Sequence, residues 1–174
     1  MVFEIVLSGA VSAILGAIAI KIADSFAERR KLIIALHAEL LLNQSKLAGE
    51  IYSIRNRGGR ISKMGNRLSD RAFQTLRTSN PRLFLKLTDE IGSLRPAYST
   101  IESRISDFET VNEAGSHFDA EAEEIAEEYT GSVIQIQEAA RGMEEYVKES
   151  WLRRLMYSPI LVDEEENKVP IEDL

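Results

Sequence analysis

The chain has 174 residues, a formal net charge of −7 and no cysteine. One domain is the natural count for this length, and the absence of cysteine fits a reducing compartment. Only four prolines and ten glycines occur, which argues against a strand-and-turn fold and favours long helices. The composition therefore predicts an all-α protein.

The charge is distributed unevenly along the chain. Residues 1–105 carry 16 basic and 9 acidic side chains, whereas residues 106–174 carry 5 basic and 19 acidic ones. This asymmetry favours pairing between the two halves of the chain before any outside partner is needed. The acidic balance of the whole chain also argues against nucleic acid as a partner.

The first predicted element is a helix that begins with the uncharged run IVLSGAVSAILGAIAI, residues 5–20. At 1.5 Å per residue the run covers about 24 Å, and its flanking residues extend it to roughly 31 Å. The hydrocarbon core of a bilayer is about 30 Å thick, so this length suffices for one crossing. We therefore predict a single transmembrane anchor over residues 1–23, with membrane lipid as its partner.

Two other interpretations of the run remain open. Ala17-Ile18-Ala19 has the small-x-small pattern of a signal-peptide cleavage site, but Glu4 and the lack of a preceding basic residue argue against one. A helix buried in the core of a soluble oligomer would also explain the high content of alanine.

The residues beside the run predict its orientation. Basic side chains follow the run and none precedes it, which places the N-terminus outside and the rest of the chain in the cytoplasm. These flanking cations are Lys21, Arg29, Arg30 and Lys31.

One face of the predicted span carries small side chains. Small residues four apart let a second helix backbone approach closely, so they predict association within the membrane and a homo-oligomer. The members of this face are Gly9, Ser12, Ala13, Gly16 and Ala17.

The first helix is expected to continue well beyond the anchor. Apolar residues keep a three-four spacing as far as Asn56, and Gly58-Gly59 then end the helix. Polar Asn43 stands where an apolar residue is due, and we interpret it as a residue that sets register or oligomeric state.

Two further helices are predicted after the first one. A short helix is expected over residues 69–78, with Phe73 and Leu76 facing inward, and Asn80-Pro81 opens the next helix. That third helix has an apolar stripe from Phe84 to Phe108 that passes through Pro96 without losing its register. We therefore predict one continuous helix that is kinked at Pro96.

The last helix is predicted over residues 119–157, followed by an acidic tail over residues 158–174. Its buried stripe ends at Trp151, and Pro159 stops it. The segment from Trp151 to Tyr157 has two interpretations. It is either a membrane-interface segment or, as we favour here, a core segment whose arginines bind the last helical carbonyls.

These elements predict an antiparallel bundle of three long helices and one short helix, over residues 24–157. In this up-down-up arrangement the first and last helices run parallel. Arg29, Arg30 and Lys31 would then face the acidic start of the last helix around Glu123 and Glu128, and the basic loop would meet the acidic tail.

A basic cluster surrounds the loop that follows the first helix. We predict an interaction site there, for which the acidic tail is the simplest partner and an outside protein the alternative. Its members are Arg55, Arg57, Arg60, Lys63, Arg67 and Arg71.

The chain offers few groups for catalysis. It has two histidines, His37 in the first helix and His117 in a turn, and neither belongs to a ligand motif of the di-iron bundle type. We expect no enzyme activity and no cofactor or metal. The sequence predicts a membrane-anchored scaffold that binds protein partners or itself; a pore- or lesion-forming effector is the alternative.

Overall fold

The computed structural model describes residues 2–56, 68–114 and 122–161. Within these ranges the side chains are described for residues 16–56, 68–107 and 123–158 and for Ile160. All regular structure in this part of the chain is helical, which confirms the prediction of an all-α fold and of a helical bundle.

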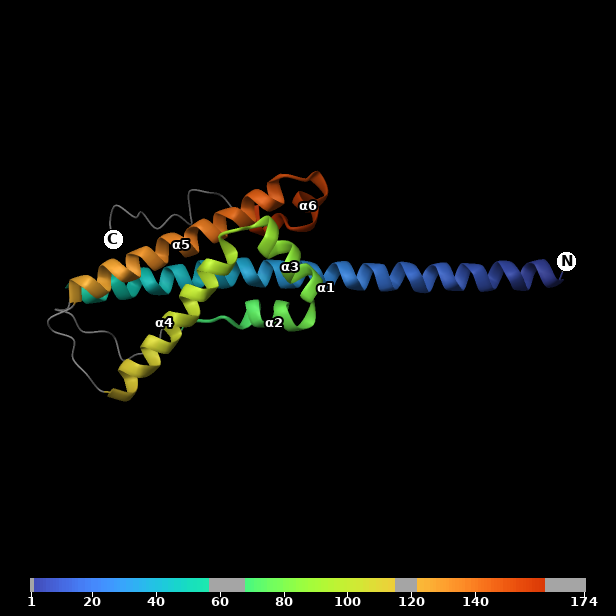
Figure 1. Cartoon of the computed structure of the whole chain (residues 1–174). Coiled ribbons are helices and arrows are strands. Elements are labelled where there is room, and N and C mark those ends of the chain that lie inside the picture. Colours follow the sequence, from blue (N-terminus) through green and yellow to red (C-terminus); the bar gives the residue numbers. More distant parts are fainter. Residues whose placement is uncertain (1, 57–67, 115–121, 162–174) are drawn as a thin grey trace.

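Helix α1, Val2–Asn56, is a single unbroken helix, and its bounds are those predicted from the apolar spacing. Its C-terminal half belongs to the bundle, and its N-terminal half projects alone (Figure 1). The predicted apolar stripe is fully buried in the C-terminal half, where its members are Ile33, Leu36, Leu40, Leu47, Ile51 and Ile54.

Helix α2, Arg71–Ser79, confirms the predicted short helix, and both Phe73 and Leu76 are buried. Before α2 begins, the chain has already returned along α1. Ser69 exchanges two hydrogen bonds with Asn43, which lies more than three turns back from the end of α1. The described residues that lead into α2, together with α2 itself, therefore form a further leg of the bundle beside α1.

The predicted kinked helix is instead two helices. Helix α3, Pro81–Glu90, begins where predicted, and the Asn80 side chain accepts a hydrogen bond from the Leu83 N–H. Helix α4, Leu94–Ala114, starts after a turn at Gly92-Ser93, so the prediction of a continuous helix was wrong.

The physical reason for the break is the position of Pro96. In a continuous helix its ring would clash with the carbonyl of Gly92, four residues earlier. In the first turn of α4 it costs little, because the N–H that it lacks would have no helical partner there. The apolar stripe survives the turn, since Leu87, Ile91 and Leu94 all remain buried.

The predicted last helix is also divided. Helix α5, Ala122–Lys148, ends before Ser150, whose backbone is extended. The short helix α6, Trp151–Met156, and the 3₁₀ turn η1, Ser158–Leu161, follow it. The buried stripe of α5 holds from Tyr129 to Val147, but Trp151 lies outside it.

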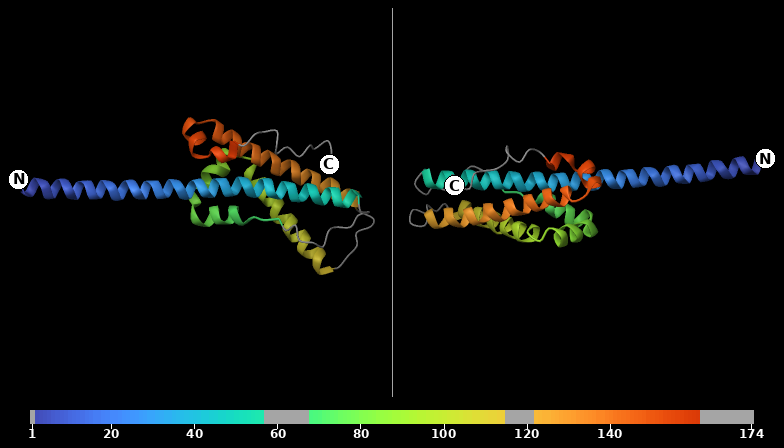
Figure 2. Two further views of the ribbon diagram at one scale, coloured as in Figure 1. Left: turned by 180° about the vertical axis from the view of Figure 1, so that it is seen from behind. Right: turned by 90° about the horizontal axis from the view of Figure 1, so that it is seen from above.

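The long helices α1 and α5 are antiparallel, which contradicts the predicted parallel pair (Figure 2). Arg55 pairs with Glu123 and His37 lies beside Glu144, so residue numbers rise along α1 as they fall along α5. The prediction treated the short second helix as no leg of the bundle. Because that segment does return along α1, the chain makes one more reversal before α5.

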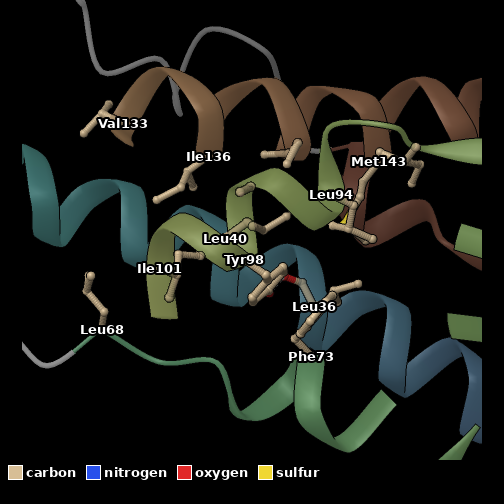
Figure 3. Packing of buried hydrophobic residues seen from close by; sticks show 14 of the residues in the cluster. Leu36, Leu40, Leu68, Phe73, Leu94, Tyr98, Ile101, Val133, Ile136 and Met143 are labelled. Atoms are coloured by element: carbon tan, nitrogen blue, oxygen red, sulfur yellow. Dashed lines mark hydrogen bonds between the residues drawn. The ribbon is translucent and has the colours of Figure 1, made fainter. Parts of the chain in front are cut away.

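One hydrophobic core joins these helices (Figure 3). Tyr98 of α4 is fully buried at its centre and stacks on Phe73 of α2, with ring centroids 4.0 Å apart. Phe84 of α3 packs edge-on against Phe73, with ring centroids 5.2 Å apart. These ring contacts join α2, α3 and α4 to one another, and the Tyr98 hydroxyl joins them to α1 through its hydrogen bond to Glu39.

No helix in the described part of the chain is both long enough and apolar enough to cross a bilayer. Most of the predicted span, up to Leu15, lies outside the residues whose side chains are described.

Candidate functional site

The projecting part of α1, which we call the arm, covers residues 2–31. Every described side chain from Gly16 to Lys31 is exposed, and burial begins at Leu32 and Ile33. Ile18 and Ile20 are 49% and 65% exposed. Because residues two apart on a helix point about 200° apart, these two side chains lie on opposite faces of the arm. The arm is therefore apolar on more than one side and is covered by nothing else in the described chain.

The predicted association face lies on this arm. The side chains of Gly9, Ser12 and Ala13 fall outside the described residues, whereas Gly16 and Ala17 are exposed. A Cβ atom added at Gly16 would meet no atom within 4 Å, so the chain leaves room there for a neighbouring helix.

The predicted flanking cations Lys21, Arg29, Arg30 and Lys31 are all exposed. The prediction that these cations face the start of α5 was wrong, because α5 runs antiparallel to α1 and its first turn lies beside Arg55. The end of the bundle that they face is instead formed by the last residues of the described chain. Burial raises the pKa of the Tyr157 hydroxyl, and the positive charges of Arg29 and Arg153 oppose the rise.

Helix α6 exposes its large apolar side chains, contrary to the prediction that they belong to the core. Trp151 is 75% and Leu155 71% exposed. The other half of that prediction is correct, because Arg153 donates to the Tyr146 carbonyl at 2.9 Å and Arg154 to the Lys148 carbonyl at 2.7 Å. The sequence signal that was missed is the polar pair Glu149-Ser150, at which α5 ends and the register of the stripe is lost.

The predicted basic cluster is described only at its two ends. Arg55 donates to Glu123 at 3.0 Å across the α1–α5 pair, and Arg71 is exposed at the first position of α2. Arg57, Arg60, Lys63 and Arg67 lie outside the described residues, as do the acidic residues of the tail, Asp163 to Glu166, that they were expected to meet. The first residues of the predicted tail form η1 instead, and Ile160 is buried. The pairing of the two halves of the chain is thus seen at Arg55, although with α5 as the partner.

A buried polar site that the sequence analysis did not identify links α1 to α2 and α4. The Glu39 side chain accepts hydrogen bonds from the Ser69 hydroxyl at 2.8 Å, the Ala72 N–H at 2.9 Å and the Phe73 N–H at 3.3 Å. The Tyr98 hydroxyl donates to the same carboxylate at 3.0 Å, and burial raises the pKa of that hydroxyl. Glu39 therefore caps the start of α2 from another helix.

Asn43 lies one turn beyond Glu39 and completes this polar site. It is fully buried, donates to the Ser69 carbonyl at 2.6 Å and accepts from the Ser69 N–H at 2.9 Å. Asn43 therefore sets a register, as predicted. The register is that of the segment around Ser69 against α1 within one chain, and not of one chain against another. The signal in the sequence was Asn43 at a position of the apolar stripe, with Glu39 one turn before it and next to Leu40 of the stripe.

His37 is buried beside Glu144, with Nε2 3.5 Å from the Glu144 carboxylate. Burial lowers the pKa of His37 to about 4, so desolvation outweighs the attraction of the nearby carboxylate. His117 falls outside the described residues. Among the residues that the structure describes, no three His, Asp or Glu side chains lie close enough together to hold a metal ion.

No family model, no curated protein and no solved structure matches the chain.

Proposed function

We propose that this chain is a single-pass membrane protein whose arm anchors a helical bundle that binds protein partners or a second copy of itself. The N-terminus lies outside and the cytoplasmic domain covers residues 24–157, in which the packed bundle begins at Leu32 and Ile33. In this proposal the bundle is a scaffold and carries out no reaction.

The observation that carries the proposal is the exposure of Ile18 and Ile20 on opposite faces of the arm. A helix that is apolar all round is one that is surrounded on all sides, either by lipid or by a protein core. A single partner helix would cover only one of these faces, whereas lipid covers both. The uncharged run from Ile5 to Ile20 supports the same choice, since it belongs to the same unbroken helix.

The length of the arm also fits a membrane. Residues 2–23 cover about 33 Å at 1.5 Å per residue, close to the roughly 30 Å of the hydrocarbon core, and the rest of the arm, residues 24–31, extends about 12 Å through the cytoplasmic headgroup layer. The bundle would therefore begin at the membrane surface, with Arg29, Arg30 and Lys31 beside the headgroups.

Extraction of membranes with alkaline carbonate tests the anchor. The full chain is expected to stay in the membrane pellet, and a chain that lacks residues 1–23 is expected in the supernatant with its helical circular dichroism intact. Because none of the described arm side chains is buried, removal of the arm should leave the bundle folded. Release of the full chain by carbonate would contradict the proposal, and so would an unfolded remainder, which would indicate a soluble oligomer with the arm in its core.

A matched pair of substitutions sharpens the result. Ile14→Lys places a charge near the midpoint of the proposed span, where insertion of a lysine costs about 2.5–3.5 kcal/mol. Leu42→Lys places the same charge on a bundle residue that is 51% exposed. Only the first variant should weaken retention in the membrane.

The orientation has its own test, because the chain has no cysteine. A cysteine at exposed Ser45 should react with an impermeant maleimide only after the cells are opened, whereas a cysteine at Val2 should react in intact cells. The reverse pattern would show that the bundle lies outside.

The effector alternative rests on the room that Gly16 leaves for a second helix. Substitution of Gly9 and Gly16 by Leu distinguishes the two functions. Loss of oligomers with an unchanged membrane supports the scaffold, whereas relief of leakage or toxicity supports a pore or lesion.

A further inference from the structure

The end of the bundle from which the arm emerges carries a second apolar surface, formed by α6. Trp151, Leu152 and Leu155 are 75%, 43% and 71% exposed. At 100° per residue these three side chains lie within about 100° of one another, so they form one face. We call this the α6 face.

The α6 face is held in place by its own arginines. Arg153 donates to the Tyr146 carbonyl, pairs with Glu90 at 3.3 Å and stacks on the Tyr146 ring at 3.8 Å. Arg154 donates to the carbonyl of Lys148, the last residue of α5. Because both arginines bind back to the bundle, the opposite face of the six-residue helix is turned outward.

The position of α6 along α1 is set by the residues that follow it. Tyr157 and Ile160 are buried, η1 contacts α1, and the charge of Arg29 reaches the Tyr157 hydroxyl. Figures 1 and 2 show α6 at the end of the bundle where the arm leaves it. The α6 face therefore lies near the level of Arg29.

We propose that the α6 face enters the headgroup region of an anionic bilayer as a second membrane contact. This inference rests on the proposed anchor. If residues 2–23 fill the hydrocarbon, Arg29 lies about 9 Å beyond it, and interfacial helices bury their apolar faces about 5–10 Å into that zone. Tryptophan is enriched there because its ring is apolar while its N–H remains hydrated.

The charges at this level agree with the same occupant. Arg29, Arg30 and Lys31 are exposed on α1, and Arg154 is exposed on α6. Cations beside an apolar face are the arrangement that anionic headgroups attract. A bundle held at two points would have a fixed tilt, so a rotation of the arm would pass directly into it.

Trp151 supplies its own probe, because it is the only tryptophan in the chain. The full chain is reconstituted into vesicles of phosphatidylcholine and phosphatidylglycerol, with lipids brominated at different depths as quenchers. Trp151 emission should shift to the blue relative to free tryptophan. Bromines near the headgroup should quench it most strongly, and bromines at the chain ends least.

Two variants provide the comparison. Leu152→Asp combined with Leu155→Asp should remove most of the quenching while the chain still resists carbonate extraction. Leu42→Asp, on an exposed bundle residue, should change neither. Because all three leucines are exposed, the variants should fold, and their circular dichroism checks this.

The outcomes separate the two proposals. Emission typical of water without quenching, in vesicles that retain the protein, overturns the α6 contact and leaves the anchor standing. A blue shift that no brominated lipid quenches also overturns it, because the α6 face would then be covered by a second copy of the chain. Failure of the protein to stay in the vesicles overturns the anchor, and the α6 contact with it.

Discussion

Arg55, in the last turn of α1, donates to Glu123, in the first turn of α5, at 3.0 Å. The side chains of the pair are 33% and 69% exposed, so its contribution to stability is at most about 1 kcal/mol. Its value is topological, because it shows that the end of α1 meets the start of α5. The two longest helices of the bundle therefore run in opposite directions.

Cross-linking should confirm this direction. With no native cysteine, the double variant Arg55→Cys/Glu123→Cys should be joined by a short bifunctional maleimide within one chain. The pair Arg29→Cys/Glu123→Cys should not be joined, since about 26 residues of α1, or roughly 39 Å, separate the two α1 positions. The opposite result would restore the parallel arrangement.

Glu39→Ala should destabilise the bundle by about 2–3 kcal/mol. The substitution leaves the first N–H groups of α2 without their acceptor and the buried Tyr98 hydroxyl without its partner. Urea unfolding measures the loss, with Glu127→Ala on the exposed side of α5 as the control. Tyr98→Phe should cost about 0.5–1.5 kcal/mol, because Glu39 keeps its other donors. Equal stabilities of all four proteins would show that Glu39 does not cap α2.

The glycines within α1 and α5 should respond differently to alanine. A Cβ at Gly49 or Gly131 would meet nothing within 4 Å, so Gly49→Ala and Gly131→Ala should each stabilise by about 0.5–1 kcal/mol. A Cβ at Gly142 would lie 2.8 Å from Cγ2 of buried Ile91. Gly142→Ala should therefore not stabilise the bundle but destabilise it by about 1 kcal/mol, because the added methyl group overpacks the site.

Thermal unfolding measures the stability of these variants. Two double variants, Gly142→Ala with Ile91→Val and Gly142→Ala with Ile91→Ala, then test whether the contact with Cγ2 causes the loss. Ile91→Val alone leaves Cγ2 in place, so the double variant should stay strained, whereas Ile91→Ala should relieve the contact at the cost of a cavity. A Gly142→Ala protein as stable as the other two alanine variants would refute the close approach of α5 to the α3–α4 turn.

His37 should make the stability of the bundle fall as the pH falls. The pKa of His37 is about 4 in the folded chain, whereas the ordinary value of 6.5 applies to the unfolded chain. Between these two pH values the unfolded chain therefore binds more protons than the folded chain. The stability is thus fully present above about pH 6.5 and is lost progressively down to pH 4, by roughly 3 kcal/mol at most. Glu144, 3.5 Å away, reduces this loss because it attracts the protonated ring.

The measurement is urea unfolding at a series of pH values, compared between the natural chain and His37→Gln. The carboxylates titrate in both proteins, so the difference between the two curves isolates His37. A difference that does not change between pH 7 and pH 4 would mean that the ring is not desolvated in the folded chain.

Arg104 should be the most sensitive cation of the bundle. It donates from Nε to the Ser132 hydroxyl at 3.1 Å, pairs with Asp107 at 2.8 Å and Glu128 at 2.5 Å, and is 11% exposed. The two carboxylates raise the pKa of its guanidinium against the effect of burial. Arg104→Ala should cost about 2–3 kcal/mol, whereas Arg141→Ala, which breaks an exposed pair within α5, should cost less than about 0.5 kcal/mol. Equal effects in urea unfolding would contradict the difference in burial.

The sequence by itself determined the helical class and the local elements. The bounds of α1, the inward side of α2 and the buried stripe from Tyr129 to Val147 follow from apolar spacing, because a helix repeats every 3.6 residues whatever it packs against. The unpaired apolar arm is likewise visible in the sequence, as a run that no charge interrupts.

Only the tertiary structure decided the direction of α5, the break before Pro96 and the surroundings of Glu39. Apolar spacing records which side of a helix is buried but not which helix covers it, so Ser69 pairing with Asn43 could not be read from it. The same limit explains Trp151, which continues the spacing of α5 and yet lies outside the core. Because α5 ends at Lys148, three residues before Trp151, the later side chains no longer follow the register of its stripe.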